Sequence, residues 1–437
     1  MLNKEAAKGI IEKTLAGVKH YAVAALSSNE QNTTRFANSG ISQNVSITDT
    51  DLNLTLYDGK KSASSKTNVL TDEGIKNLVK SAESILEHVP EGEFEAFPFS
   101  KEPVPESEPD GILAKALGTA ERAAYVKEGI GLIEPGFTGA GALSFNRYCL
   151  AQGSSTGGLR YSAYDYANFN TVITHEDGTA GAGECCSFTK TPDIIGQFKK
   201  AQATAKAARN AVSPVLGAHT VVLSPVAFGD LVQFVCFMLN AKTVENGVSF
   251  AVGKLGQKVF GENLTMCDHV GHPLLRPHFY DAEGNPRKEV TLIDKGVVSS
   301  FLYDNIMAKR HNVESTGHSV GLGRGGRPFN VVVEGGGKSL EEIIADTDKG
   351  IFINEFNYTN VVNPRTLQIT GLTRNGAFLI EKGKLTTPMA TVRFTESMLD
   401  AFSSISAISK ERELVAGYMV SLVPGVRIEN FHFTSKP

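Results

Sequence analysis

The chain lacks the features that mark membrane and secreted proteins. It has no apolar run of about 18 residues, so we expect no membrane-spanning helix. Its N-terminus reads MLNKEAAKGIIEKTLAGVKH, without the apolar core of a signal peptide. Only five cysteines occur in 437 residues, and so few thiols fit a reducing compartment. We therefore expect a cytoplasmic protein with no membrane partner.

An excess of charge of one sign is also missing. The chain has 43 Lys and Arg against 47 Asp and Glu, a net charge of -4. No Lys/Arg run is long enough to follow a phosphate backbone, so we expect no direct contact with nucleic acid. Apolar residues make up 41% and charged residues 21%, which is ordinary for a globular protein.

Several catalytic motifs are absent or incomplete. No Gly-x-Ser-x-Gly elbow occurs, so a serine hydrolase is not indicated. The glycines of Gly321-x-Gly323-x-Gly325-Gly326 neither follow a clear strand nor open a helix, so they predict a turning loop rather than a dinucleotide site. The adjacent Cys185 and Cys186 are interpreted as small side chains packed in a strand, with a redox pair as the alternative.

The densest group of metal-ligating residue types lies in mid-chain. Its spacing, C-D-H-x-x-H-x5-H, matches no established zinc pattern, and glycine and proline surround it. We interpret it as a polar turn before a strand, with a metal site left as the alternative. Its members are Cys267, Asp268, His269, His272 and His278.

Apolar periodicity is the strongest signal that the chain does contain. Residues 72–89 form one continuous apolar stripe, with Thr71 as the N-cap, which predicts a helix. Leu52, Leu54 and Leu56 alternate with polar residues, which predicts a strand before a turn at 58–59. Similar patterns predict helices at 1–19, 111–128, 193–211, 227–239, 339–346 and 396–412, and strands at 160–174, 219–223 and 426–433. The glycines at 335–337 should separate a strand from the helix at 339–346, where Ser339 and Glu342 form a capping box.

These elements mix strands and helices without regular alternation, which indicates an α+β fold. Five prolines between Pro90 and Pro109 predict an extended linker. We expect an N-terminal α/β domain with antiparallel strands at 1–105, ending in that linker. A middle region of strands and helices at 106–215 should pack against it, and a β-rich C-terminal domain should span 216–437.

The stretch from Glu334 to Ala390 closely resembles the C-terminal signature of the TldD/PmbA family, the so-called modulators of DNA gyrase. Its most specific parts are SLEEII at 339–344, Asn363-Pro364 and G-x-FLIE at 376–381. RFANSGI at 35–41 and ESTGH at 314–318 extend the resemblance over nearly the whole chain. The resemblance implies the same α+β fold.

Active members of this family are zinc metallopeptidases with a His-Glu-x-x-x-His motif and a later cysteine ligand. Here no histidine lies between His219 and His269, and no cysteine follows Cys267. The helix that matches the motif is VAFGDLVQFVCFMLN after Val221–Pro225. The resemblance places Gln233 and Phe234 at the His-Glu positions and Met238 at the second His. We interpret this helix as buried core, so Phe234 and Met238 should both be buried.

The resemblance therefore implies a PmbA/TldE-like chain with no catalytic, cofactor-binding or metal-binding residues of its own. A TldD-like subunit would supply zinc in a heterodimer, or the chain would pair with itself, and the substrates would be unfolded peptides. One alternative is an independent peptidase that uses a metal site outside the family pattern, such as the Cys267–His278 group. The other is a binding protein, without enzymatic activity, that modulates gyrase or another partner.

Overall fold

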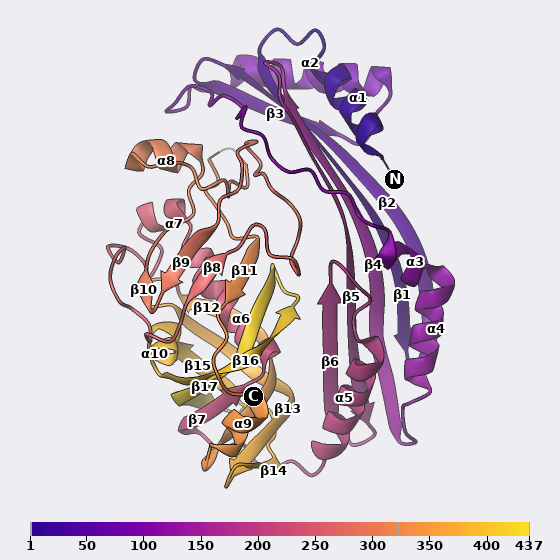
Figure 1. The fold of residues 1–437 in the computed structure, drawn as a ribbon, viewed down its shortest axis with the longest axis vertical. Coiled ribbons are helices and arrows are strands. Elements are labelled where there is room, and N and C mark those ends of the chain that lie inside the picture. Colours follow the sequence, from indigo (N-terminus) through magenta and orange to yellow (C-terminus); the bar gives the residue numbers. More distant parts are fainter. Residues whose placement is uncertain (1, 322, 437) are drawn as a thin grey trace.

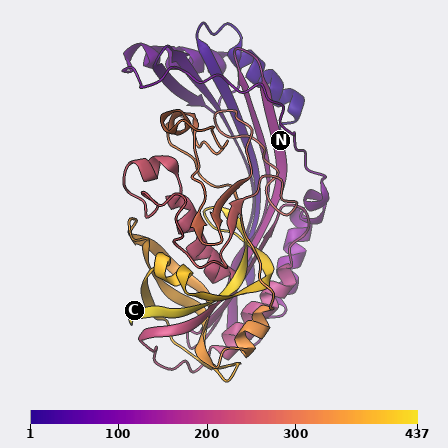
Figure 2. The same cartoon turned by 60° about the vertical axis from the view of Figure 1, so that its left-hand side comes forward.

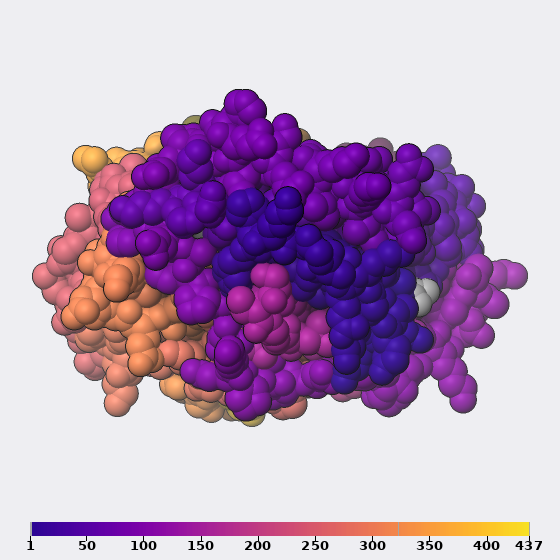
Figure 3. Space-filling model, turned by 90° about the horizontal axis from the view of Figure 1, so that it is seen from above, coloured from indigo at the N-terminus to yellow at the C-terminus, as the bar shows by residue number. Residues whose placement is uncertain are grey.

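A computed structural model describes residues 2–321 and 323–436. A long curved sheet runs along one side of the molecule, and the C-terminal half packs against its hollow side (Figure 1, Figure 2). Seen from above, the N-terminal segments cover most of the upper end of the molecule (Figure 3). No helix in these described ranges is both long and apolar enough to cross a membrane.

The first sheet has six strands in the order β3-β2-β1-β4-β5-β6, and every neighbouring pair is antiparallel. Its strands are β1 (Tyr21–Ala37), β2 (Gly40–Asp58), β3 (Lys61–Thr67), β4 (Phe137–Ser154), β5 (Leu159–His175) and β6 (Ala180–Ser187). The predicted alternation in β2 is confirmed, because Leu52, Leu54 and Leu56 are all fully buried. The predicted turn leads from Asp58 through Gly59 into β3.

Five helices accompany this sheet: α1 (Lys4–Leu15), α2 (Asp72–His88), α3 (Ile112–Ala116), α4 (Thr119–Ile130) and α5 (Ile194–Ala207). Thr71 caps α2, because its side chain accepts a hydrogen bond from the Gly74 amide. The single helix predicted at 111–128 is wrong: the chain breaks between α3 and α4. The buried Arg122 of α4 donates to the freed Leu117 carbonyl at 2.7 Å, which stabilises the break.

The second sheet has 11 strands and belongs to the C-terminal half. Its strands are β7 (Gly217–Leu223), β8 (Met266–Asp268), β9 (Val290–Asp294), β10 (Val297–Val298), β11 (Asn330–Val333), β12 (Lys349–Asn363), β13 (Gln368–Glu381), β14 (Lys384–Pro388), β15 (Arg393–Ser397), β16 (Ile405–Val415) and β17 (Val420–Ser435). The helices of this half are α6 (Pro225–Met238), α7 (Ala241–Glu245), α8 (Asn305–His311), α9 (Leu340–Ala345) and α10 (Met398–Ser403). Together they confirm a β-rich C-terminal part in an α+β fold.

The helix predicted at 396–412 is also wrong. Only the short α10 forms there, and Ser404 ends it. The chain then enters β16, which pairs antiparallel with β17. Ile405 and Ile408 of β16 are buried in the core of the C-terminal half. Sheet pairing and burial of these β-branched side chains outweigh the weak helical pattern of a serine-rich segment.

Side chains alternate between the two faces of the first sheet, so one face packs against α1 and α2 and the other against the second sheet. Cys149 and Tyr161 pack under α1 and α2 on one face. Tyr148 and Tyr164 point to the other face, where they join a cluster with side chains of the second sheet. The expected division at 105 lies in the segment between α2 and α3, and the one at 215 lies just before β7. Both divisions stay predictions.

Candidate functional site

The helix that the family resemblance singles out is α6, and its prediction at 227–239 is confirmed. Ser224 fixes its N-terminus by accepting a hydrogen bond from the Ala227 amide and donating one to the Asn354 carbonyl of β12. Most of its side chains lie in the large core of the C-terminal half. The sequence forms a helix here because an N-cap and Pro225 start a run with no interior helix breaker but Gly229.

The three side chains that the resemblance aligns with the family's His-Glu-x-x-x-His motif have different surroundings. Gln233 is buried and accepts a hydrogen bond from the Tyr418 amide at 3.3 Å. Phe234 is 9% exposed and belongs to the core, which confirms its predicted burial. Met238 is only partly buried at the edge of this core. Its predicted burial is therefore confirmed only in part.

These residues do not fit a zinc ion. Protein ligands for zinc are thiolates, imidazoles and carboxylates, whereas an amide, a phenyl ring and a thioether stand at these positions. Throughout residues 2–321 and 323–436, no three or more His, Cys, Asp or Glu residues are grouped so that they could hold a metal ion.

A group of three carboxylates lies around α6 and was not foreseen from the sequence. Glu184 comes from β6, Asp230 from α6 and Glu355 from β12. Burial raises the pKa of each to about 7, and the negative charge of Glu355 adds to the shift of the other two. Each of these carboxyls therefore titrates near neutral pH. No local sequence signal could identify them, because they lie on three distant elements.

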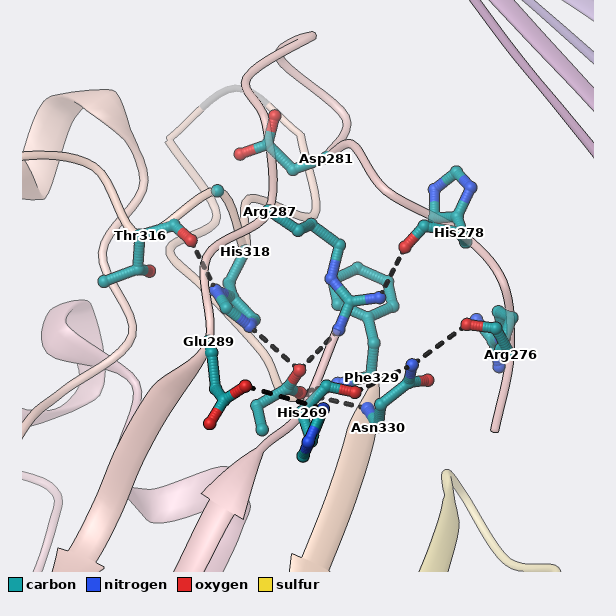
Figure 4. Close-up of polar contacts among 12 residues, drawn as sticks. His269, Arg276, His278, Asp281, Arg287, Glu289, Thr316, His318, Phe329 and Asn330 are labelled. Carbon is teal, nitrogen blue, oxygen red and sulfur yellow. Dashed lines mark hydrogen bonds and ion pairs between the residues drawn. The ribbon is translucent and has the colours of Figure 1, made fainter. Parts of the chain in front are cut away.

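Asp268, at the end of β8, is the centre of a buried polar network. Figure 4 labels its partners Arg287, His318, Phe329 and Asn330. Its carboxylate forms an ion pair with Arg287 and lies 3.2 Å from Nε2 of His318. It also accepts hydrogen bonds from the backbone amides of Phe329 and Asn330. Burial alone would raise the pKa of Asp268, but the positive charge of Arg287 and the neighbouring imidazole of His318 outweigh it and hold this pKa well below its usual value.

The predicted polar turn at 267–278 is therefore only partly correct. Asp268 and His278 are buried, not solvated. His269 lies 3.6 Å from the carboxylate of Glu289 and packs edge-on against the ring of His272. Burial lowers the pKa of His278 far below its usual value, and neighbouring arginines add to this. Asp268 and His269 thus have ion-pair partners outside the group, Arg287 and Glu289.

The cysteines carry no sign of a reactive thiolate. Cys185 and Cys186 lie in β6, which confirms the predicted strand. Burial raises the pKa of Cys186 to about 12 and that of Cys267 to about 11. A thiol with such a pKa stays protonated at neutral pH and is a poor nucleophile.

The two glycine-rich segments have structural roles. In the first, the Gly325 amide donates to the carboxylate of Asp304 at 2.7 Å, and no helix follows. Leu322 of this segment lies outside the described residues. The second, 335–337, separates β11 from α9 as predicted. Ser339 and Glu342 form the predicted capping box of α9.

Comparisons with known proteins agree with this fold. The sequence model of the PmbA/TldA metallopeptidase C-terminal domain matches residues 216–435, and that of PmbA/TldA metallopeptidase domain 1 matches residues 22–86. A metalloprotease of Methanocaldococcus jannaschii is 28% identical over 208 residues, which are 46% of this chain and 46% of that protein. Metalloprotease PmbA of Escherichia coli O157:H7 is 22% identical over 282 residues, 60% of this chain and 57% of its own. The chain spans about half the length of these curated relatives.

Two solved structures share the whole fold. The crystal structure of TldE from Thermococcus kodakarensis has a TM-score of 0.84 at 21% identity, covering 98% of this chain and 100% of its own. A protein of Bacteroides thetaiotaomicron, proposed as a modulator of DNA gyrase, has a TM-score of 0.86 at 20% identity, with 100% of both chains covered. Because one family model alone spans half of the sequence, the chain belongs to the TldD/PmbA family.

Proposed function

We propose that this chain is the metal-free, non-catalytic subunit of a cytoplasmic TldD/PmbA-type peptidase that processes unfolded peptides. The observation that carries the proposal is the chemistry of α6. At the positions of the family's histidines and glutamate it has Gln233, Phe234 and Met238, and two of these side chains are buried. A buried amide and a core phenyl ring supply neither a zinc ligand nor a general base.

The partner in this proposal is a TldD-like chain that carries zinc, paired with this chain as a heterodimer. Zinc bound there would activate a water molecule for peptide hydrolysis. This chain would contribute surfaces that hold an extended peptide in place, which raises the rate by reducing the motion of the substrate. Tyr148 is suited to this role, because it is only partly buried where the first sheet faces the C-terminal half.

The proposal is tested by reconstitution. The chain, a zinc-loaded TldD-like homologue and their mixture are each incubated with an unfolded, fluorescently labelled peptide. We expect no cleavage by this chain alone and faster cleavage by the mixture than by the homologue alone. Size-exclusion chromatography with light scattering shows whether the two chains form a complex.

Two other outcomes would replace the proposal. Cleavage by this chain alone, abolished by His269→Ala together with His272→Ala, would favour an independent peptidase. Those two histidines are suitable because, unlike His278, neither is buried. Complex formation that leaves the cleavage rate unchanged would instead favour a binding protein without a role in hydrolysis.

A further inference from the structure

The ring of Phe329, just before β11, is surrounded by three arginines. The guanidinium carbon lies 4.7 Å from the ring centroid for Arg287, 5.5 Å for Arg327 and 6.0 Å for Arg276. An aromatic face attracts each cation. The cations repel one another, however, so such a group needs negative charge nearby.

Only one of these arginines has a carboxylate partner. Asp268 pairs with Arg287, lies 3.2 Å from Nε2 of His318 and accepts hydrogen bonds from two backbone amides. Among the residues that the structure describes, no Asp or Glu forms an ion pair with Arg276 or Arg327. The positive charge of these two arginines is therefore not balanced within the described chain.

Arg276 also lacks a hydrogen-bond acceptor. Its Nε is buried and has no partner among the described residues. Buried N–H groups in folded proteins are nearly always hydrogen-bonded, so an unpaired one points to an acceptor that comes from outside the chain. Figure 4 shows Arg276 on the loop that borders the Asp268 network, on the side away from His318.

The surroundings of Arg276 and Arg327 include a second unpaired group. His278 is 7% exposed, and its buried Nδ1 has no partner either. Arg327 is exposed, so a ligand can reach this region from solvent. The pKa of Arg327 is lowered by desolvation and by the charge of Arg276. An anion bound between the two arginines would remove that repulsion.

Aromatic side chains of the first sheet border the same place. The Arg276 guanidinium lies 5.8 Å from the ring centroid of Tyr164, and this ring stacks on Tyr148 at 5.1 Å. Arg276 therefore lies where the C-terminal half faces the first sheet. Flat aromatic rings beside a cation provide an apolar surface next to a charged one.

We infer that Arg276 and Arg327, here called the arginine pair, bind a carboxylate of the peptide substrate beside Phe329. The planar fork of a guanidinium matches the two oxygens of a carboxylate. Tyr148, which is only partly buried, would then contact the residues next to that carboxylate. The inference rests on the proposed function, and it adds the group of the peptide that this chain recognises: its C-terminal carboxylate or an acidic side chain.

The test is direct binding to the full chain, measured by fluorescence anisotropy. The probes are three labelled Gly/Ser/Ala peptides: one with a free C-terminal carboxylate, one amidated, and one amidated with an internal Glu. We expect the amidated neutral peptide to bind about tenfold more weakly than the peptide with a free carboxylate, because a charge-assisted hydrogen bond is lost. Comparable binding of the third peptide would identify an acidic side chain as the recognised group, and the site would stand.

Variants test whether the arginine pair causes the preference for the peptide with a free carboxylate. Arg276→Gln combined with Arg327→Gln should remove the difference between the first two peptides, whereas Arg276→Lys should keep part of it. Arg35→Gln, at an exposed arginine of β1, is the matched control and should leave the difference intact. Arg327→Gln alone covers the case in which the double variant does not fold.

A carboxylate preference that persists in the folded double variant, or no preference in the wild-type chain, would overturn the inference. These results are separable from the proposed function. Loss of the preference with normal stimulation of the TldD-like homologue would reject only the arginine site. A carboxylate preference without any stimulation would reject only the peptidase role.

Discussion

Arg287 and Asp268 form an ion pair in which neither side chain has any exposure to solvent. Arg287 also donates to the His278 carbonyl at 2.7 Å, so one side chain connects β8 with the loop that follows it. Removing two charges from water is costly, and it is tolerated here because Asp268 accepts from several donors. Loss of either side chain would therefore leave the other as an unpaired buried charge at the centre of the network.

We expect Asp268→Asn to lower the free energy of unfolding by about 3–5 kcal/mol, because it leaves the Arg287 charge buried without a counter-charge. Urea denaturation followed by circular dichroism measures the change. Asp346→Asn removes a carboxylate that pairs with Lys338 at the surface, and it should leave stability close to that of the wild type. Equal stability of the two variants would contradict the importance of the buried pair.

The carboxylates around α6 predict a pH dependence. The folded-state pKa of Glu184 is about 7, against 4.5 for an unperturbed glutamate. Between these values the folded chain keeps a proton that the unfolded chain has lost. Raising the pH through this window therefore lowers the free energy of unfolding. The stabilising contribution is complete below pH 4.5 and absent above pH 7.

Glu184→Gln should consequently be more stable than the wild type at pH 8, by roughly 1–2 kcal/mol because the carboxyl is partly solvated, and should lose this advantage at pH 5. Unfolding midpoints across this range provide the measurement. Glu128→Gln, at an exposed glutamate of α4, is the control and should leave the stability unchanged at both pH 5 and pH 8. A pH profile of Glu184→Gln that runs parallel to the wild type would show that this group does not titrate in the window.

Phe234 and Met238 should differ in their effect on stability. Phe234→Ala removes a core side chain and should cost about 3–5 kcal/mol through lost burial and a residual cavity. Met238→Ala should cost less, because that side chain is only partly buried. Thermal or denaturant midpoints compare the two. A wild-type midpoint for Phe234→Ala would mean that this face of α6 borders solvent.

The chain purified alone should hold far less than one zinc ion. After chelation and dialysis against zinc, elemental analysis should find only substoichiometric metal, because the resemblance aligns an amide and a thioether of α6 with the family's two histidine ligands. The zinc-loaded TldD-like homologue, treated in parallel, is the positive control. A tightly held zinc in this chain, at about one per molecule, would contradict the proposed role.

Sequence patterns predicted those elements whose signals are local. The stripe of α2, the alternation of Leu52, Leu54 and Leu56, and the Ser339 capping box each lie within a few neighbouring residues, and all three are confirmed. The strand β16 was missed because its pairing with β17 decides its conformation. The intrinsic helix or strand propensity of a segment predicts its conformation poorly where tertiary contacts dominate.

The candidate site was predicted less completely for the same reason. The partners of Asp268 lie farther along the chain, at Arg287 and His318, so a reading of 267–278 alone could not show that this carboxylate is buried. The arginine pair has no motif either, since Arg276 and Arg327 meet only around Phe329.

The pairing of β7 has a consequence for how the chain folds as it leaves the ribosome. Leu223 of β7 lies opposite Val426 in β17 and opposite Ile353 in β12, both far later in the sequence. The second sheet therefore cannot close until Val426 has been synthesised, while the strands of the first sheet are available much earlier. Contacts this distant in sequence form slowly, and unpaired strands aggregate. During synthesis, the apolar β7 and α6 would need protection, which chaperones provide for nascent chains.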